Sequence, residues 1–283
     1  MTPHDIPHDI PRGSGGEEQP PTPRIDTSVP HSARIWNYWL GGKDNYAVDR
    51  AAGDKIKRIF PDIQIMAQDG RAFLGRAVRC LAAEHGIRQF LDLGTGLPTD
   101  DNTHQIAQQV NPTARVVYVD NDPVVLVHAR ALLTSSPPGV CQYIDADLTD
   151  PRRVLDQAER TLDLEEPVAV ILASVLPHIP DDGDAAWTVW QYMDAVAPGS
   201  ALVISHDAPE PSLVEAAREF VARGGPVVKP RTYEQVAGLI PDGVHVVEPG
   251  VTATWAWRPN AQTPQRNTTL QYGLVAVKAG EDR

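Results

Sequence analysis

Aspartates stand where the predicted strands of this chain end, and a glycine turn follows the first of them. Residues 89–93 form a short apolar run interrupted by Asp92, and the run continues into Gly94-Thr95-Gly96. Glycines let a backbone turn sharply and approach a ligand without a Cβ in the way. A strand, a Gly-x-Gly turn and a helix in this order are typical of a cofactor cradle at the carboxyl edge of an α/β sheet.

Further acids close the next two predicted strands. Asp120 ends the second strand, and Asp145 and Asp147 lie at the end of the third. In a parallel sheet these ends share one edge, so the carboxylates should converge on one crevice. We expect Asp120 to accept hydrogen bonds from both hydroxyls of a ribose, since a carboxylate offers several acceptor sites. Asp147 can accept from an adenine amino group while Leu148 packs against the ring.

The competing interpretation is that these acids only cap helices. Helices are predicted to begin near Pro123 and Pro151, each directly after an aspartate. Asp122 and Asp150 fit the capping role better than Asp120 does, so the ribose interpretation is kept for Asp120.

The turn itself narrows the choice of cofactor. A dinucleotide fingerprint has a third glycine, whereas this chain has Pro98 and Thr99, followed by Asp100 and Asp101. Two carboxylates at a helix start favour an amine or another cation and repel a pyrophosphate. A cofactor with adenosine, an ammonium and a sulfonium but no phosphate fits, and S-adenosylmethionine is that molecule. The same residues disfavour the enzymatic alternative, a nicotinamide-dependent dehydrogenase.

The elements that must position these residues alternate regularly from Arg88 onward. Strands are predicted near 89–93, 115–120, 140–145, 168–174 and 200–206, with two later strands near 244–248 and 271–278. Helices are predicted near 100–110, 122–134, 151–163, 183–196 and 211–223, and Thr232 and Gln235 form a capping box for a short helix. Apolar strands alternating with helices predict a parallel sheet covered on both faces.

Two segments precede the sheet. Residues 1–30 are rich in proline and glycine and are predicted to be a disordered tail. Residues 31–86 are predicted to be helical, beginning with Ser32 as the N-cap of a helix over 33–40 that ends at Gly41-Gly42. A second helix ends before Pro61, and a third runs from Ile63 to about Glu84. The remaining domain covers 87–283.

Composition excludes several classes of protein. The net charge of −12 argues against a general nucleic-acid binder. Cys80 and Cys141 fall in apolar surroundings and are predicted to be reduced thiols. The polar N-terminus is unlike a signal peptide, and no apolar run has the roughly 20 residues of a membrane span, so we expect a soluble, cytoplasmic protein. No His/Cys cluster has zinc-like spacing, and no metal is expected.

The chain resembles the class I S-adenosylmethionine-dependent methyltransferases through Asp92-Leu93-Gly94-Thr95-Gly96, Asp120 and Asp147. More narrowly, it resembles a bacterial S-adenosyl methyltransferase family long catalogued as a domain of unknown function. That similarity covers nearly everything after the tail. Its three signature strings span residues 32–46, 94–99 and 119–123, beginning SARIWNYWLGG, GTGLPT and VDNDP respectively.

The resemblance implies a Rossmann-like, doubly wound α/β fold. It implies a seven-stranded, mostly parallel sheet with an antiparallel last strand, which agrees with the two late strands predicted above. It also implies a cofactor over residues 94–96, with Asp120 and the adjoining Asn121 beside the ribose. The helical segment before the sheet would form a lid, bringing Lys43, Asn45 and Tyr46 to the cofactor.

Aromatic residues of the first helix have two interpretations. Trp36 and Trp39 share its apolar face and are predicted to pack in the core. Tyr38 lies off that face and is the better candidate for contact with cofactor or substrate.

Methyl transfer from a sulfonium needs little beyond positioning in a dry pocket, although a base helps when the acceptor must lose a proton. In this fold the exit of the fourth strand, including Ser174, faces the transferred methyl. His178 is therefore a candidate base with Asp181 as a partner, and the alternative is a histidine that only packs. His206, followed by Asp207, is the second candidate. The sequence contains no Gly-x-Ser-x-Gly motif, which carries the nucleophile of many serine hydrolases. A Ser-His-Asp hydrolase is therefore disfavoured.

We therefore expect an S-adenosylmethionine-dependent methyltransferase that acts on a small molecule, with no nucleic-acid or membrane partner. The alternative from another class is a protein that binds the cofactor without catalysis, as a sensor or a partner subunit. The sequence leaves the methyl acceptor, the modified atom and the oligomeric state open.

Overall fold

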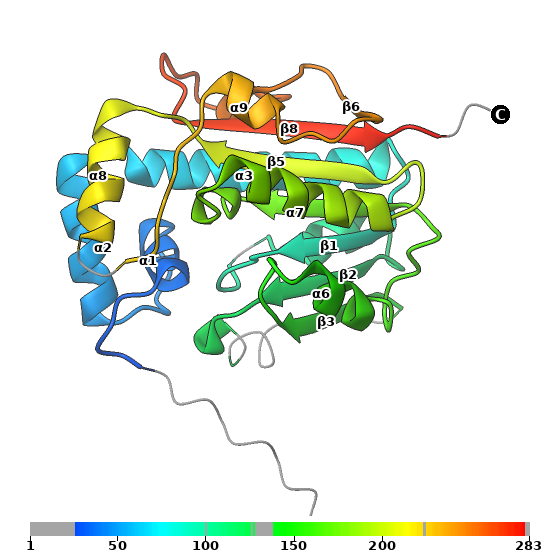
Figure 1. Ribbon diagram of the computed structural model, residues 1–283, viewed down its shortest axis with the longest axis horizontal. Coiled ribbons are helices and arrows are strands. Elements are labelled where there is room, and N and C mark those ends of the chain that lie inside the picture. Colours follow the sequence, from blue (N-terminus) through cyan, green and yellow to red (C-terminus); the bar gives the residue numbers. More distant parts are fainter. Residues whose placement is uncertain (1–25, 100, 126, 128–137, 223–224, 281–283) are drawn as a thin grey trace, which may run out of the picture.

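A computed structural model describes residues 26–99, 101–125, 127, 138–222 and 225–280 of the 283-residue chain. Within these residues it forms one sheet with helices on both faces (Figure 1). The predicted tail therefore lies outside the described residues up to position 25, as does most of the helix predicted over 122–134.

Eight strands of the described chain form the sheet, in the order β3-β2-β1-β4-β5-β8-β6, with β7 also paired to β8. The first five are parallel, and β8 runs antiparallel to β5, β6 and β7. The strands are β1 (Gln89–Leu93), β2 (Arg115–Asp120), β3 (Val140–Asp145), β4 (Val168–Ala173), β5 (Ala201–Asp207), β6 (Val244–Val246), β7 (Thr252–Ala253) and β8 (Gln271–Lys278).

Alternate strand residues serve two apolar layers. On β1, Leu91 and Leu93 face one core and Phe90 faces the other, and β2, β4 and β5 alternate in the same way. One layer packs against α6 (Pro151–Ala158), α7 (Asp182–Ala195) and α9 (Tyr233–Ala237). The opposite layer packs against α3 (Ile63–Ala83) and α4 (Thr103–Val110). Burial on both faces explains why these strands read as continuous apolar runs.

A third apolar cluster joins the N-terminal helices to the end of the sheet. It brings α1 (Ser32–Trp39), α2 (Ala47–Ile59) and the start of α3 together with α8 (Pro211–Val221), through residues such as Trp39, Ile63 and Leu213. In Figure 1 the parallel strands point toward the side where α1, α2 and α8 lie. These helices therefore stand over the carboxyl edge of the sheet. That the segment works as a lid stays a prediction.

The predicted fold class is confirmed, and four strand ranges agree with the structure residue for residue. The count differs from seven because the two-residue β7 also pairs with β8. His31 rather than Ser32 is the N-cap residue of α1, and Ser32 is the first helical residue. The predicted capping box is present, since Thr232 and Gln235 each accept the other's backbone N–H.

Candidate functional site

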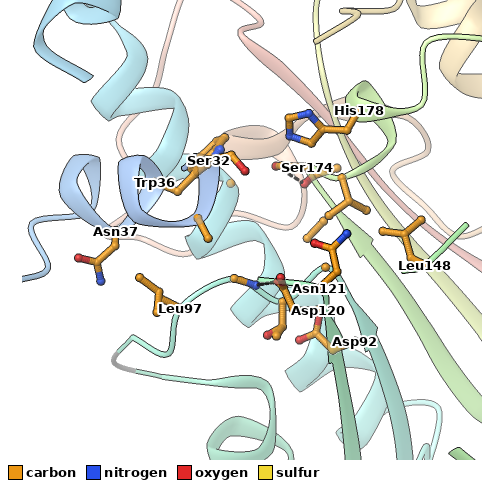
Figure 2. A pocket seen from close by; sticks show the side chains of 18 of the residues that line it. Ser32, Trp36, Asn37, Asp92, Leu97, Asp120, Asn121, Leu148, Ser174 and His178 are labelled. Carbon is orange, nitrogen blue, oxygen red and sulfur yellow. Dashed lines mark hydrogen bonds between the residues drawn. The ribbon is translucent and has the colours of Figure 1, made fainter. Parts of the chain in front are cut away.

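A cavity of about 490 Å³ lies at the carboxyl edge of the sheet, between the strand ends and α1. It is lined by ten of the predicted site residues: Asp92, Gly94, Thr95, Gly96, Asp120, Asn121, Asp147, Leu148, Ser174 and His178. Figure 2 shows Asp92, Asp120 and Asn121 at one end of it and Trp36, Ser174 and His178 at the other. The size falls within the range of small-molecule and cofactor sites. Asp145 does not line this cavity, although it closes the neighbouring strand.

The glycine turn after β1 is held against β2. The N–H of Gly94 donates to the carbonyl of Val119 at 2.7 Å, and both Gly94 (φ +69°) and Gly96 (φ +67°) adopt the left-handed conformation. A Cβ on Gly94 would come within 2.2 Å of a methyl carbon of Val175, whereas a Cβ on Gly96 would meet nothing within 4 Å. Gly94 therefore packs against protein, and Gly96 presents bare backbone to the cavity.

Asp120 links this turn to the end of β2. One carboxylate oxygen accepts the N–H of Gly96 at 2.8 Å, and the other accepts the N–H of Asp122 at 2.9 Å. Burial raises the pKa of Asp120, and these two bonds oppose the rise. Because a carboxylate has about four acceptor sites, both oxygens keep acceptor capacity for ligand hydroxyls. The capping role belongs instead to Asp122 and Asp150, which accept the N–H groups of Val124 and Arg153.

Asp92 points toward the helical layer formed by α3 and α4. Its carboxylate accepts a hydrogen bond from the hydroxyl of Thr103, at the start of α4, with an oxygen–oxygen distance of 2.6 Å. Burial raises the pKa of this carboxyl to about 6, against the opposing effects of Thr103 and Arg71. Asp92 is thus a buried acid that is hydrogen-bonded to a hydroxyl and also lines the cavity.

Asp101, one of the two acids predicted at the start of α4, lies outside the helix. Asn102 is the N-cap residue, and Asp101 precedes it with φ +59° and accepts a bond from Arg71 through its carbonyl. Asp100 lies outside the described residues. Asp147 accepts the N–H and hydroxyl of Thr149, which shapes the turn that carries Leu148 into the cavity.

His178 lies opposite the glycine turn, in η1 (Leu176–His178), a short 3₁₀ helix that follows β4. Its Nδ1 lies 3.0 Å from the carbonyl oxygen of Val227. A carbonyl can only accept, so this contact fixes the proton on Nδ1 and makes Nε2 the acceptor in the neutral ring. The carboxylate of Asp181, the predicted partner of His178, instead accepts the N–H groups of Gly183 and Asp184 at the start of α7.

His206 occupies a different position from the one expected of a base. It is fully buried, its Nδ1 lies 3.1 Å from the carbonyl of Asp207, and its Nε2 lies 3.0 Å from Nη1 of Arg231. Burial and the nearby guanidinium lower its pKa to about 4, so the ring is neutral at pH 7. Both ring nitrogens are occupied by protein, and His206 does not line the cavity. The structure therefore places His206 outside the cavity, and this geometry does not support its predicted catalytic role.

Four predicted cofactor ligands from the N-terminal segment also lie away from the cavity. The hydroxyl of Tyr38 donates to Asp54, Lys43 and Tyr46 are exposed, and the amide of Asn45 donates to Asn37. The later part of the signature string, with Lys43, Asn45 and Tyr46, therefore builds the turn between α1 and α2, whereas its earlier part contributes residues of α1 to the cavity wall. The cause is helical geometry: Tyr38 and the cavity-lining Trp36 lie on different faces of α1.

The structure adds cavity residues that the sequence did not indicate. They come mainly from α1 and α3, and include His31, Ser32, Asn37, Gly70, Arg71 and Leu97. Trp36, predicted to pack in the core, is half-buried and lines the cavity, whereas Trp39 is buried as expected. The spacing of His31, Ser32 and Trp36 places them along one side of the first helix, and this was the available signal for a cavity wall. The same spacing is equally typical of a helix face that packs against the protein core.

No helix among the described residues is both long and apolar enough to span a membrane. The same part of the chain holds no group of three or more His, Cys, Asp or Glu side chains arranged for a metal ion.

Comparisons with known proteins indicate the family of the chain. A family model described as S-adenosyl methyltransferase matches residues 18–279. A crystal structure of a DUF574 family protein from Streptomyces avermitilis is 41% identical, with a TM-score of 0.86, and the match covers 90% of this chain and 100% of that chain. A presumed methyltransferase from Thermobifida fusca is 39% identical, with a TM-score of 0.83, over 90% and 97% of the two chains. No curated protein matches the sequence.

Proposed function

We infer the detailed function from the premise that the chain belongs to the S-adenosyl methyltransferase family, and is thus an S-adenosylmethionine-dependent methyltransferase. We propose that it transfers the methyl group to a small-molecule acceptor, with the cofactor bound along the glycine turn. The observation that carries this proposal is that one cavity unites Gly96, Asp92, Asp120 and His178. The comparisons lend no support to a dehydrogenase or to a non-catalytic binding protein.

The residues present fit this cofactor. The bare backbone at Gly96 leaves room for a ligand, and the carboxylate of Asp120 beside it has acceptor capacity for a ribose diol. Asp92 places negative charge where an ammonium can lie, and Leu148 offers an apolar surface for adenine. When bound, S-adenosylmethionine supplies a methyl group on a positively charged sulfur.

The chain's own residues then position and deprotonate the acceptor. His178 presents Nε2 as a proton acceptor, because the Val227 carbonyl holds Nδ1 in its protonated form. Ser174, at the end of β4 with φ +58°, lies at the same end of the cavity (Figure 2). A base at this end of the cavity is useful when the acceptor is an amine or a hydroxyl that must lose a proton.

Calorimetric titration with S-adenosylmethionine and S-adenosylhomocysteine tests the cofactor assignment. We expect binding at sub-millimolar concentration, and its absence would refute the assigned cavity. Production of S-adenosylhomocysteine in cell extract with the protein, compared with extract alone, then tests turnover. Binding without any increase in product would favour the non-catalytic alternative.

A further inference from the structure

A second, smaller cavity opens beside the first. It has a volume of about 60 Å³, and four residues line both cavities: Ser32, Trp36, Ser174 and His178. Figure 2 places all four at the same end of the larger cavity. We call the smaller cavity the inner chamber. It therefore adjoins the larger cavity at the end where the candidate base lies.

The walls of the inner chamber are apolar. Helices α1, α2, α3 and α8 contribute them, through Ile35, Trp39, Ile56, Ile63, Met66, Leu213 and Phe220. By the volume that a water-sized probe occupies, 60 Å³ holds roughly four heavy atoms. The chamber thus suits a short aliphatic group and excludes a fused ring system.

One carboxylate interrupts the apolar lining. Asp207, the last residue of β5, lines the chamber and is 5% exposed. It accepts a hydrogen bond from the Gln271 amide at 3.0 Å, and the same amide nitrogen donates to Ser174 at 2.9 Å. This shared donor places the carboxylate close to Ser174, at the junction of the two cavities.

His178 is the basic side chain that the described lining places near Asp207. Among the described residues that line the chamber there is no lysine or arginine. Burial raises the pKa of Asp207, opposed by Gln271 and by the nearby His178 imidazole. A buried carboxylate is costly unless a cation or strong donors meet it, and it rejects an acidic ligand.

We propose that the inner chamber is the acceptor subsite and that it takes a small aliphatic amine, with the amine nitrogen at the junction beside Asp207 and His178. This proposal rests on the proposed methyltransferase function. The apolar walls enclose the alkyl group, and Asp207 pairs with the ammonium form of the nitrogen. Asp207 then determines specificity for an amine over an alcohol or an acid.

The reaction at the junction balances with the groups present. His178 accepts one proton from the bound ammonium on Nε2, which frees the nitrogen lone pair. The nitrogen forms the new bond to the methyl carbon while the carbon–sulfur bond breaks and leaves its electron pair on sulfur. The product is an N-methylated ammonium and neutral S-adenosylhomocysteine, and His178 returns its proton to solvent.

The test is an NMR titration of the protein saturated with S-adenosylhomocysteine, using isobutylamine, isobutanol and isobutyrate as probes. We expect isobutylamine to bind at least tenfold more tightly than the other two. Asp207→Asn should abolish that preference and leave S-adenosylhomocysteine affinity within twofold. Equal binding of the alcohol, binding of the acid, or an unchanged preference in Asp207→Asn would overturn the amine assignment.

A second variant guards against a folding defect in Asp207→Asn. Ala217→Leu projects from α8 into the chamber, and Ala222→Leu is its control at an exposed position just after the same helix. We expect only Ala217→Leu to exclude isobutylamine, and binding retained in this variant would also refute the subsite. Failure of S-adenosylhomocysteine to bind the unmodified protein would instead refute the proposed function, so the two failures are distinguishable.

Discussion

Nδ1 of His31 lies 2.8 Å from a carboxylate oxygen of Asp122. His31 precedes the first helix, and Asp122 lies just beyond the strand that supplies Asp120. Burial alone would raise the pKa of Asp122, but His31 and the N–H of Val124 outweigh it, so the pKa lies below its ordinary value. The pair thus joins the N-terminal segment to the acid-bearing edge of the sheet, beside the cavity.

Removing the imidazole should loosen this connection. We expect His31→Ala to lower the free energy of unfolding by about 1 kcal/mol, because it leaves a buried carboxylate oxygen without its partner. Since His31 also lines the cavity, S-adenosylhomocysteine should bind several-fold more weakly. Urea unfolding and calorimetry measure the two effects. His85→Ala, at an exposed position after α3, is the control and should change neither.

Gly96 separates backbone strain from ligand contact. Gly96→Ala should cost about 1 kcal/mol of stability, because alanine disfavours a positive φ. Gly86→Ala is a close match, since Gly86 has the same φ of +67° and no atom within 4 Å of a built Cβ, but does not line the cavity. Thermal unfolding should show similar losses in both variants.

Cofactor affinity should distinguish these two glycine variants. We expect at least a tenfold loss for Gly96→Ala and none for Gly86→Ala, measured by titration with S-adenosylhomocysteine. Equal affinities would mean that the cofactor does not approach the turn at Gly96.

Asp92 should make stability depend on pH in the direction opposite to most acids. Its folded-state pKa of about 6 exceeds the unfolded value of 3.8, so its favourable contribution is complete below pH 4 and is lost as pH rises through 6. The loss is on the order of 3 kcal/mol, from about 1.4 kcal/mol per pKa unit. We expect Asp92→Asn to remove this dependence.

The measurement is the difference in unfolding free energy between the unmodified protein and Asp92→Asn at pH 4.5 and pH 7. The difference should grow in favour of the variant at the higher pH. Asp145→Asn, which alters an exposed acid at the end of β3, should track the unmodified protein. A pH-independent difference for Asp92→Asn would contradict a raised pKa at Asp92.

Arg231 should be required for the position of the 3₁₀ turn that carries His178. The guanidinium is fully buried and donates to the carbonyls of Leu176 and Ile179, on either side of His178, at 3.0 and 2.7 Å. Lysine cannot reproduce this fork, so Arg231→Lys should lose about 3 kcal/mol of stability. Chemical denaturation measures the loss. A shift below 1 kcal/mol would show that the turn is held by other contacts.

His178 should matter for turnover more than for cofactor binding. If Nε2 accepts the acceptor's proton, His178→Ala should lower S-adenosylhomocysteine production in extract by a factor of about 10² or more. Affinity for S-adenosylhomocysteine should stay within a few-fold. His245→Ala, an exposed histidine on β6, serves as the control. Unchanged turnover in His178→Ala would refute the general-base role.

Local patterns were sufficient to predict the sheet and one side of the cavity. Strand ends in a parallel sheet share an edge, so Asp92, Asp120 and Asp147 had to meet once the strands were identified. Gly94 and Gly96 indicated the turn after the first strand, because few other residues adopt a positive φ. These predictions needed only periodicity and backbone geometry, which act over a few residues.

The other side of the cavity depended on packing between distant segments. The residues around each strand end do not reveal whether His178 or His206 faces the cavity. The reason is that the contact of the His206 ring with the buried Arg231 joins residues that are distant in the sequence. Trp36 and Tyr38 differ by two residues on α1, and only the docking of that helix decided which one reaches the cavity. Sequence determined the element and its polar groups, whereas tertiary contacts determined which of those groups remain available to a ligand.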